Sequence, residues 1–356
     1  MKERINQITV SPTMSILAAL RRMDEVGYKL LLLRDGEIFL GLLSVGDIQR
    51  AIIKNVDMSA PISTILRKEF LTCSDTLTRE EIKREFLRAC SVFMPILTQD
   101  NRLVDVAFWD EFFPSEYVAV RDKLGLPVVI MAGGVGSRLQ PLTNVIPKPL
   151  VPLGKKTMIE TIMDRFLSVD CSRFLVSVNY KANLLRYYFE HESTLRYDIS
   201  FFQETKPMGT AGSLSLIKDQ LKSTFFVSNC DSLIDQGFDE ILAYHRSNSN
   251  ELTIVSALKH VRLAYGSLHT GDDGLLKRLE EKPEFVFKVN TGVYILEPSV
   301  LADIHEGEFL NMTDLIDRLL SRNSRIGCFP VSEGSWIDIG SWAEYQSVLE
   351  SGDFNG

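Results

Sequence analysis

The chain has 356 residues, of which 45% are hydrophobic and 24% charged, and its formal net charge is -8. These proportions are typical of a globular protein, and the acidic charge argues against nucleic acid or an anionic membrane as a partner. Its apolar runs are no longer than a strand, it begins without a secretory leader, and its five cysteines are scattered, so we expect a cytoplasmic protein with reduced thiols.

The first part of the chain, residues 1–117, contains a repeat of about 60 residues. Each copy is expected to contain a helix, a strand, a tight turn, a second strand and the start of another helix. The helices are predicted over Ser15–Val26 and Arg79–Ala89, and the strand pairs over Lys29–Leu33 with Phe39–Leu43 and over Phe93–Leu97 with Leu103–Ala107.

This repeat resembles a pair of cystathionine-β-synthase (CBS) motifs, which implies a tandem α+β module with clefts for adenine nucleotides. By that resemblance Ser44 and Asp47 are suited to ribose hydroxyls, whereas the second copy has Ala107 in place of the serine and keeps Asp110. An aspartate that opens a helix is also a satisfactory N-cap, so a structural role explains Asp47 equally well. CBS pairs also dimerise, so we expect a homo-oligomer through this module, with a regulatory or a purely architectural role.

Charged residues, glycine and proline interrupt the apolar periodicity between Ser115 and Pro127. We therefore predict a linker over residues 118–126, between a module at 1–117 and a second domain at 127–356. Each part is long enough to form its own core.

The second domain opens with a pattern that suits a triphosphate. An apolar run from Pro127 to Ala132 is typical of a strand covered on both faces. The glycines that follow, Gly133, Gly134 and Gly136, let backbone N–H groups approach phosphate oxygens. Arg138 adds a fork of donors, and Lys148 lies between two prolines that restrict its backbone. The spacing differs from both the dinucleotide fingerprint and the P-loop.

The sequence GG-x-G-x-R followed by PKPL resembles the signature of the sugar-phosphate nucleotidylyltransferases, and this resemblance extends from Leu126 to about Leu349. It implies an α/β fold, a Rossmann-like nucleotidyltransferase domain with a mixed central sheet. It also implies that a sugar 1-phosphate attacks the α-phosphorus of a nucleoside triphosphate and releases pyrophosphate. Such a reaction needs positioning and electrostatic stabilisation rather than a protein nucleophile.

The resemblance also assigns a base-reading loop. Glu204 stands five residues before Gly209, at the position that contacts the base in relatives. A carboxylate only accepts hydrogen bonds and guanine offers two adjacent donors, so Glu204 favours GTP. The alternative is a solvated loop glutamate beside Lys206. Gly209 and Gly212 are expected to let the backbone approach the nucleotide closely.

The apolar strand from Phe225 delivers Asn229 and Asp231 at its end, where ligands collect in open α/β sheets. Asp231 and Asp338, in the W-x-D-x-G segment, resemble the family's pair of Mg²⁺ ligands. A lone aspartate after a strand is more often a cap or turn former, and the second aspartate favours the metal site.

The resemblance places the sugar phosphate on a later group of residues: Tyr265, Gly266, Glu281, Lys282, Asn290 and Gly292. Taken singly, Glu281 and Lys282 could be a surface charge pair and residues 289–296 an ordinary strand. Their order along the chain favours the site. The residues expected to carry catalysis are Arg138, Lys148, Asp231, Lys282 and Asp338, and those expected to bind the nucleotide are Ala132, Gly133, Gly134, Gly136, Arg138, Glu204, Gly209 and Asn229.

The expected reaction joins a nucleoside triphosphate, favoured as GTP, to a hexosamine or hexose 1-phosphate with Mg²⁺ as cofactor. The two-part layout resembles guanylyltransferases for glucosamine 1-phosphate in legionaminic acid pathways. A non-catalytic sensor or regulatory subunit that binds nucleotide sugars is one alternative, and the presence of Lys148 and both aspartates argues against it. Cytidylyl or molybdopterin-type transfer to a non-sugar acceptor is another, disfavoured by the Glu-Lys-Pro and W-x-D-x-G segments.

Overall fold

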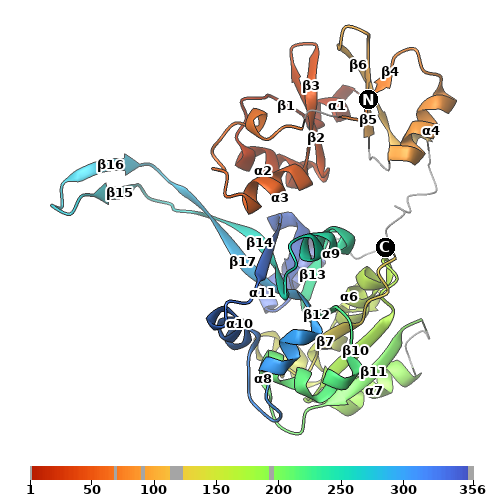
Figure 1. Ribbon diagram of the computed structural model, residues 1–356, viewed down its shortest axis with the longest axis vertical. Helices are drawn as coiled ribbons and strands as arrows, with labels where there is room; N and C mark the ends of the chain where they lie inside the picture. Colours follow the sequence, from red (N-terminus) through yellow and green to blue (C-terminus); the bar gives the residue numbers. More distant parts are fainter. Residues whose placement is uncertain (1, 68–69, 90–92, 113–122, 192–195, 352–356) are drawn as a thin grey trace. The chain divides into compact units, whose positions relative to one another are not determined.

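The computed structural model of the chain describes residues 2–67, 70–89, 93–112, 123–191 and 196–351 (Figure 1). The chain divides into two compact units, residues 1–120 and 121–356. Residues 118–122 of the predicted linker lie outside the described residues. Leu124 already belongs to the second unit, since its N–H donates to the carbonyl of Val169 (2.8 Å).

The N-terminal unit contains two three-stranded sheets with the same topology. The first half contains α1 (Lys2–Ile8), β1 (Thr9–Val10), α2 (Ile16–Val26), β2 (Leu30–Asp35), β3 (Ile38–Ser44), α3 (Val45–Ile53) and the short η1 (Ile62–Thr64). The second contains β4 (Cys73–Ser74), α4 (Arg79–Ala89), β5 (Phe93–Leu97), β6 (Leu103–Phe108) and α5 (Trp109–Phe112). In each sheet the first strand runs parallel to the second, and the second antiparallel to the third. The structural repeat therefore follows the repeat in the sequence.

Local chemistry explains where α2 begins and ends. The Ser15 side chain accepts a hydrogen bond from the N–H of Ala18, and Gly27 ends the helix in the left-handed conformation. The buried residues recur every three or four positions: Ile16, Ala19, Leu20 and Met23.

The C-terminal unit is built on a mixed seven-stranded sheet in the order β11-β10-β7-β12-β17-β14-β18. Its strands are β7 (Val128–Met131), β10 (Arg173–Val178), β11 (Asp198–Gln203), β12 (Phe225–Asn229), β14 (Leu252–Arg262), β17 (Glu284–Leu296) and β18 (Ile326–Val331). Within the described sheet, β17 runs antiparallel to both neighbours and the other adjacent pairs are parallel. The expected α/β fold with a mixed central sheet is confirmed.

Two hydrophobic cores cover the faces of this sheet. Val128 and Ile130 enter one core and Val129 the other, because successive side chains of a strand point to opposite faces. The surrounding elements are α6 (Met158–Leu167), α7 (Ala182–His191), α8 (Gly209–Gly212), α9 (Phe238–Ser247), α10 (Met312–Ser321) and α11 (Trp342–Ser351), the 3-10 segments η2 (Ser137–Leu139), η3 (Leu142–Asn144), η4 (Lys148–Leu150), η5 (Ser213–Gln220), η6 (Pro298–Asp303) and η7 (Glu333–Ser335), and the strand pairs β8 (Pro152–Leu153) with β9 (Lys156–Thr157) and β13 (Ser232–Ile234) with β19 (Trp336–Asp338). No described helix is long and apolar enough to cross a bilayer.

Strands β14 and β17 continue beyond the sheet as a two-stranded ribbon, which ends in the hairpin of β15 (Ser267–Thr270) and β16 (Leu276–Glu280). Figure 1 shows this ribbon leaving the body of the C-terminal unit. We call residues 259–287 the arm.

Candidate functional site

A cavity of about 500 Å³ lies at the carboxyl ends of β7 and β12. Its lining contains most of the predicted nucleotide and catalytic residues of the body, namely Gly133, Gly134, Gly136, Arg138, Lys148, Glu204, Gly209, Asn229 and Asp231. Ala132 lies just outside the lining, where it is 2% exposed and its N–H donates to the carbonyl of Ser177 (3.1 Å). The linear motifs are thus brought to one place.

The glycine-rich loop packs directly against the segment that carries Lys148. Gly136 has a φ of 70°, and a Cβ built on it would lie 2.9 Å from Thr143 Cγ2 and 3.0 Å from Lys148 Cβ. Thr143 also donates its hydroxyl to the Gly136 carbonyl (2.9 Å). Glycine is therefore required here by a left-handed backbone and by the approach of Lys148.

Lys148 forms an ion pair with Asp231 at the wall of the cavity. Its Nζ contacts Asp231 Oδ2, and the two side chains are only 10% and 12% exposed. Arg138 Nη2 lies 4.0 Å from the same oxygen and is 65% exposed. Because water is largely excluded from the pair, the lysine is held at a fixed position in which its charge is weakly screened.

Asp231 and Asp338 lie at the ends of adjacent segments. β13 pairs with β19, which sets Ser232 opposite Asp338, and the N–H of Ile339 donates to the Asp231 carbonyl (2.9 Å). Burial raises the pKa of Asp338, and the negative charges of Asp231 and Glu344 raise it further. Two carboxylates that repel one another fit a divalent cation. Mg²⁺ is held through one or two carboxylates, because it keeps waters and takes phosphate oxygens, so the two aspartates would fit it. Within the described residues no group of three or more His, Cys, Asp or Glu side chains could hold a metal ion.

Cys230 precedes Asp231 and is a buried strand-end thiol. Burial raises the pKa of Cys230 to about 12, so the group stays protonated at neutral pH. It supplies packing rather than a nucleophile.

Glu204 is buried in the cavity wall, with 9% of its surface exposed. Its Oε1 accepts a hydrogen bond from Ser177 Oγ (2.6 Å) and its Oε2 one from the N–H of Met208 (3.1 Å). The alternative of a solvated loop glutamate is therefore wrong. Each carboxylate oxygen can accept a second hydrogen bond, so the held carboxylate can still accept from a base edge.

The two glycines after Glu204 pack against a neighbour that the sequence did not indicate, and their approach to the nucleotide stays a prediction. A Cβ on Gly209 would lie 2.4 Å from the carbonyl oxygen of Leu310, and one on Gly212 would lie 2.4 Å from that of Glu308. The N–H groups of Ala211 and Gly212 both donate to the Leu310 carbonyl (2.9 Å each). These glycines admit the backbone of residues 308–310, although Gly209 also lines the cavity.

This packing introduces residues that the motifs did not indicate. Phe309 lines the cavity and remains 61% exposed, and Ser177, Asn179 and Tyr180 complete the wall beside Glu204. An exposed phenyl ring in the lining of the cavity suits stacking on a base or ribose.

The predicted sugar-phosphate residues divide into two groups. Tyr265, Gly266, Glu281 and Lys282 lie on the arm, and none of these described residues lines the cavity. Gly266 and Glu281 are neighbours there, since a Cβ on the glycine would lie 3.1 Å from Glu281 Oε2.

The other two sugar-phosphate residues are in the body. Gly292 has a φ of 81° and packs on Asn229, whose Nδ2 would lie 2.2 Å from an added Cβ. Asn290 accepts a hydrogen bond from the Gly292 N–H (3.0 Å) and donates one to Tyr294 Oη (2.7 Å). The body therefore brings only Asn290 and Gly292 towards the predicted nucleotide site.

A second cavity, of about 300 Å³, lies beside Asp338. Its lining is Lys259, Glu333, Trp336, Ile337, Asp338, Glu344, Ser347 and Val348. The buried Trp336 Nε1 finds no hydrogen-bond partner within the described part of the chain. The carboxylates of Glu333, Asp338 and Glu344 beside the indole ring suit a hydroxylated ligand.

In the N-terminal unit, Ser44 is the N-cap of α3 and Asp47 is the N3 partner in its capping box, so the expectation that Asp47 itself is the N-cap is wrong. Its Oδ2 accepts from the Ser44 N–H (2.8 Å) while the Ser44 hydroxyl accepts from the Asp47 N–H (3.3 Å). Its Oδ1 pairs with Arg67 Nε (2.9 Å) and with Arg50. With its side chain 1% exposed, Asp47 fits the structural alternative, and the ribose role of Ser44 and Asp47 stays a prediction.

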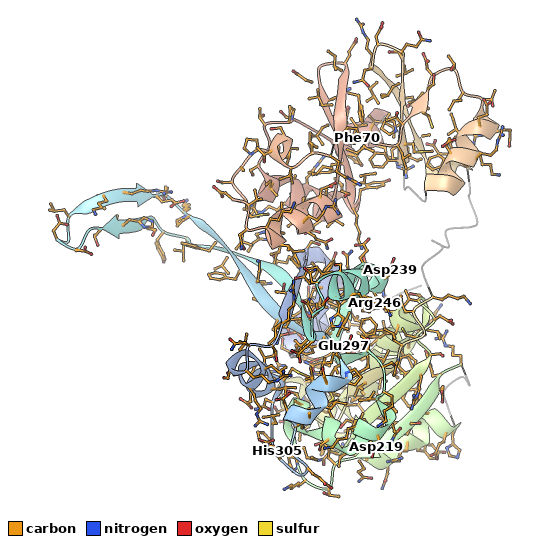
Figure 2. The ribbon with its side chains drawn as sticks, in the orientation of Figure 1. Phe70, Asp219, Asp239, Arg246, Glu297 and His305 are labelled. Carbon is orange, nitrogen blue, oxygen red and sulfur yellow. The ribbon has the colours of Figure 1, made fainter. Side chains whose placement is uncertain are left out.

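Phe70 closes over the same strand. A Cβ on Gly41 would lie 2.6 Å from Cζ of Phe70, which is labelled in Figure 2. The middle of β3 is therefore covered by the Phe70 ring.

Comparisons with known proteins agree with this geometry. The model of the nucleotidyl transferase family matches residues 127–351, and that of the CBS domain matches residues 3–54. The chain is 33% identical over 230 residues to mannose-1-phosphate guanylyltransferase catalytic subunit beta of Dictyostelium discoideum, with 63% of this chain and 64% of that protein covered. It is 33% identical over 228 residues to the mannose-1-phosphate guanyltransferase of Schizosaccharomyces pombe, with 62% of each covered.

Among solved structures, the crystal structure of HddC from Yersinia pseudotuberculosis matches with a TM-score of 0.51 and 25% identity, covering 64% of this chain and 99% of that one. The chain spans 64% and 62% of the two curated relatives, less than two thirds of each. The chain belongs to the nucleotidyl transferase family and carries a CBS domain at its N-terminal end.

Proposed function

We propose that this protein is a sugar-1-phosphate guanylyltransferase, which forms a GDP-sugar and pyrophosphate from GTP and a hexose or hexosamine 1-phosphate. The observation that carries the proposal is the larger cavity, where the glycine loop, the buried Lys148–Asp231 pair and the buried Glu204 meet. Triphosphate, metal and base each have a chemically matched partner there.

The reaction is a direct displacement. A phosphate oxygen of the sugar 1-phosphate forms a bond to the α-phosphorus, and the bond from that phosphorus to the bridging oxygen of pyrophosphate breaks. Arg138 and Lys148 hold and neutralise phosphate oxygens as charge develops. Asp231 and Asp338 would hold Mg²⁺, which supplies further neutralisation at the α-phosphate.

Guanine recognition rests on Glu204. Its carboxylate is fixed by Ser177 and the Met208 N–H, so it presents acceptors to the cavity without first being ordered. Guanine alone among the common bases offers adjacent N1–H and amino donors to such a group. The names of the curated relatives, which are guanylyltransferases, support the same choice.

The acceptor sugar has a candidate position in the smaller cavity beside Asp338. The relatives named for mannose 1-phosphate support a hexose phosphate, whereas a hexosamine phosphate of a legionaminic acid pathway rests on the two-part layout alone. The CBS domain is proposed to regulate through an adenine nucleotide or to hold copies together.

The test is pyrophosphate release with Mg²⁺ from four nucleoside triphosphates, each combined with mannose, glucose, glucosamine and N-acetylglucosamine 1-phosphates. We expect turnover with GTP and one or two of these sugars, and AMP or ATP added to that reaction tests regulation. GTP binding without turnover on the whole panel would instead favour the non-catalytic sensor.

A further inference from the structure

The arm exposes an apolar surface that is unusual for a chain acting alone. Nine large apolar side chains on it are 40–81% exposed: Val261, Leu263, Tyr265, Leu268, Leu275, Leu276, Leu279, Phe285 and Phe287. Figure 2 shows the side chains of the outer part of the arm, around the β15–β16 hairpin, standing clear of the body, whereas Lys259 and His260 at its base contact Glu333. At roughly half exposure these side chains present on the order of 700 Å² of apolar surface, which is close to the roughly 800 Å² that each partner contributes to a standard interface.

The apolar side chains are organised by the strand register. Val261 lies opposite Phe285, and Leu268 lies opposite Leu279, so each pair shares one face of the ribbon. The rings of Phe285 and Phe287 stack with centroids 6.4 Å apart. A two-stranded ribbon is marginally stable in water unless something packs on it, so these faces call for a covering surface.

The geometry at the base of the arm favours docking on a surface outside its own C-terminal unit. The β14–β17 pairing continues in register from Ser256 opposite Asn290 to Arg262 opposite Glu284, and the Leu263 N–H extends it to the Pro283 carbonyl (3.0 Å). The arm is therefore a direct extension of two central strands. The continuous ladder holds Tyr265, Glu281 and Lys282 along the line of these strands and outside the lining of the larger cavity of their own chain.

The predicted sugar-phosphate-binding residues of the arm indicate which surface the arm docks on. The residues predicted to bind the sugar phosphate include Tyr265, Gly266, Glu281 and Lys282 of the arm. None of these four lines the larger cavity of its own chain. A second copy of the chain offers a cavity that lacks the same groups. An exchange of arms about a twofold axis would complete both sites at once, which is the closed arrangement that homodimers prefer.

We propose that the arm docks on a second copy of this chain and places Lys282, with Glu281, at the phosphate-binding end of the partner's cavity. The site-sharing half of this proposal rests on the proposed function. The docking half rests on the exposed apolar faces and the continuous ladder. The cation of Lys282 would meet the incoming sugar phosphate, whose charge is additional to that of the triphosphate held by Arg138 and Lys148.

The test of site sharing is complementation between inactive variants. Lys282→Ala removes the arm's cation and Asp231→Asn disables the cavity, so we expect each variant alone to lose turnover. Heterodimers co-expressed with two tags and purified over both should regain about half of the wild-type turnover, because one of their two sites is intact. The matched control combines Lys148→Ala with Asp231→Asn, which both lie in the same cavity and should not complement.

Docking is tested without any activity measurement by placing a photo-crosslinking amino acid at position 268 of the full chain. We expect a product of twice the chain mass, linked to the body of the second copy and lost in the Phe285→Ser/Phe287→Ser variant. Crosslinks confined to one chain, or the absence of crosslinks, would overturn the docking. Site sharing would be overturned if crosslinks form between two chains and the wild type is active, but the heterodimers have no turnover. An inactive wild type would reject the proposed function alone.

Discussion

Lys148 and Asp231 lie 83 positions apart in the sequence and form a buried ion pair, because η4 and the end of β12 meet at the wall of the larger cavity. Without a ligand, the positive charge of Lys148 is neutralised by the negative charge of Asp231. A triphosphate with its cation would draw Lys148 towards phosphate oxygens and Asp231 towards the metal. The pair is therefore both a structural element of the cavity wall and the proposed source of two catalytic contacts.

We expect Lys148→Met to reduce both stability and activity. Removing one partner of a buried pair leaves the charge of Asp231 uncompensated, which lowers the free energy of unfolding by about 3–5 kcal/mol. Urea denaturation followed by circular dichroism measures this change, and pyrophosphate release measures turnover.

The double variant Lys148→Met/Asp231→Leu separates the two effects. It should regain most of the lost stability, because no charge is left unpaired, and it should stay inactive. Lys123→Met is the surface control, since that lysine is 83% exposed and lies 3.9 Å from Asp170. It should change the unfolding free energy by less than about 1 kcal/mol. Turnover in the double variant would contradict the assigned roles.

Glu204→Gln is expected to weaken the preference for GTP. The amide replaces one acceptor with a donor, which would face the guanine donors, so kcat/KM for GTP should fall by about 10–100-fold, equivalent to one charged hydrogen bond. The values for the other three triphosphates should change less. Ser177→Ala removes only the support of Oε1 and should give a smaller loss. An unchanged ranking of the four bases in Glu204→Gln would remove Glu204 as the base reader.

Gly209→Ala tests the close approach between the base-reading loop and Leu310. Gly209 has a φ of 74°, and an added Cβ would lie 2.4 Å from a backbone oxygen. We expect a loss of about 2–5 kcal/mol, from left-handed backbone strain and overpacking together. Thermal unfolding of the C-terminal unit reports it.

Gly274→Ala is the matched control for backbone strain. Gly274 has a similar φ of 77°, and nothing lies within 4 Å of an added Cβ. It should cost only the strain, about 1–2 kcal/mol. Equal losses in the two variants would mean that the approach of Leu310 contributes nothing.

The linear motifs predicted the parts of the site whose chemistry is local. The strand before Gly133, the glycine loop and the positions of Lys148 and Asp231 follow from residue type and spacing, and the structure gathers them in one cavity. Phe309 could not be predicted, because an isolated phenylalanine in a loop shows no sign of the cavity until residues 308–310 pack on Gly209 and Gly212.

The same limit applies to the arm. Residues 289–296 can be predicted as a strand, but their sequence does not show that β14 and β17 continue past the sheet to Arg262 and Glu284. Asp47 shows a different limit, because a capping aspartate and a ribose ligand are the same residue at the same position. The contacts with Ser44 and Arg67 show the structural role, and the ribose role stays a prediction.

The buried His245 predicts how stability depends on pH. Its Nδ1 lies 2.8 Å from Thr253 Oγ1 and its Nε2 lies 3.0 Å from Oε1 of Glu297, which is labelled in Figure 2. The neutral ring satisfies both contacts, with Nε2–H donating to the carboxylate and Nδ1 accepting from the hydroxyl. Burial lowers the pKa of His245, and the opposing effect of Glu297 is smaller.

The folded protein therefore binds fewer protons than the unfolded chain at pH values just below the ordinary histidine pKa of about 6.5. This contribution to stability is complete above that pH and is lost as the pH falls below it, by up to about 1.4 kcal/mol per pH unit. Urea denaturation between pH 8 and 5 should show a steeper loss below pH 6.5 in the parent than in His245→Gln. His191→Gln, at an exposed histidine, should retain the parent's slope, and a parent slope equal to that of His245→Gln would show that His245 is not the group responsible.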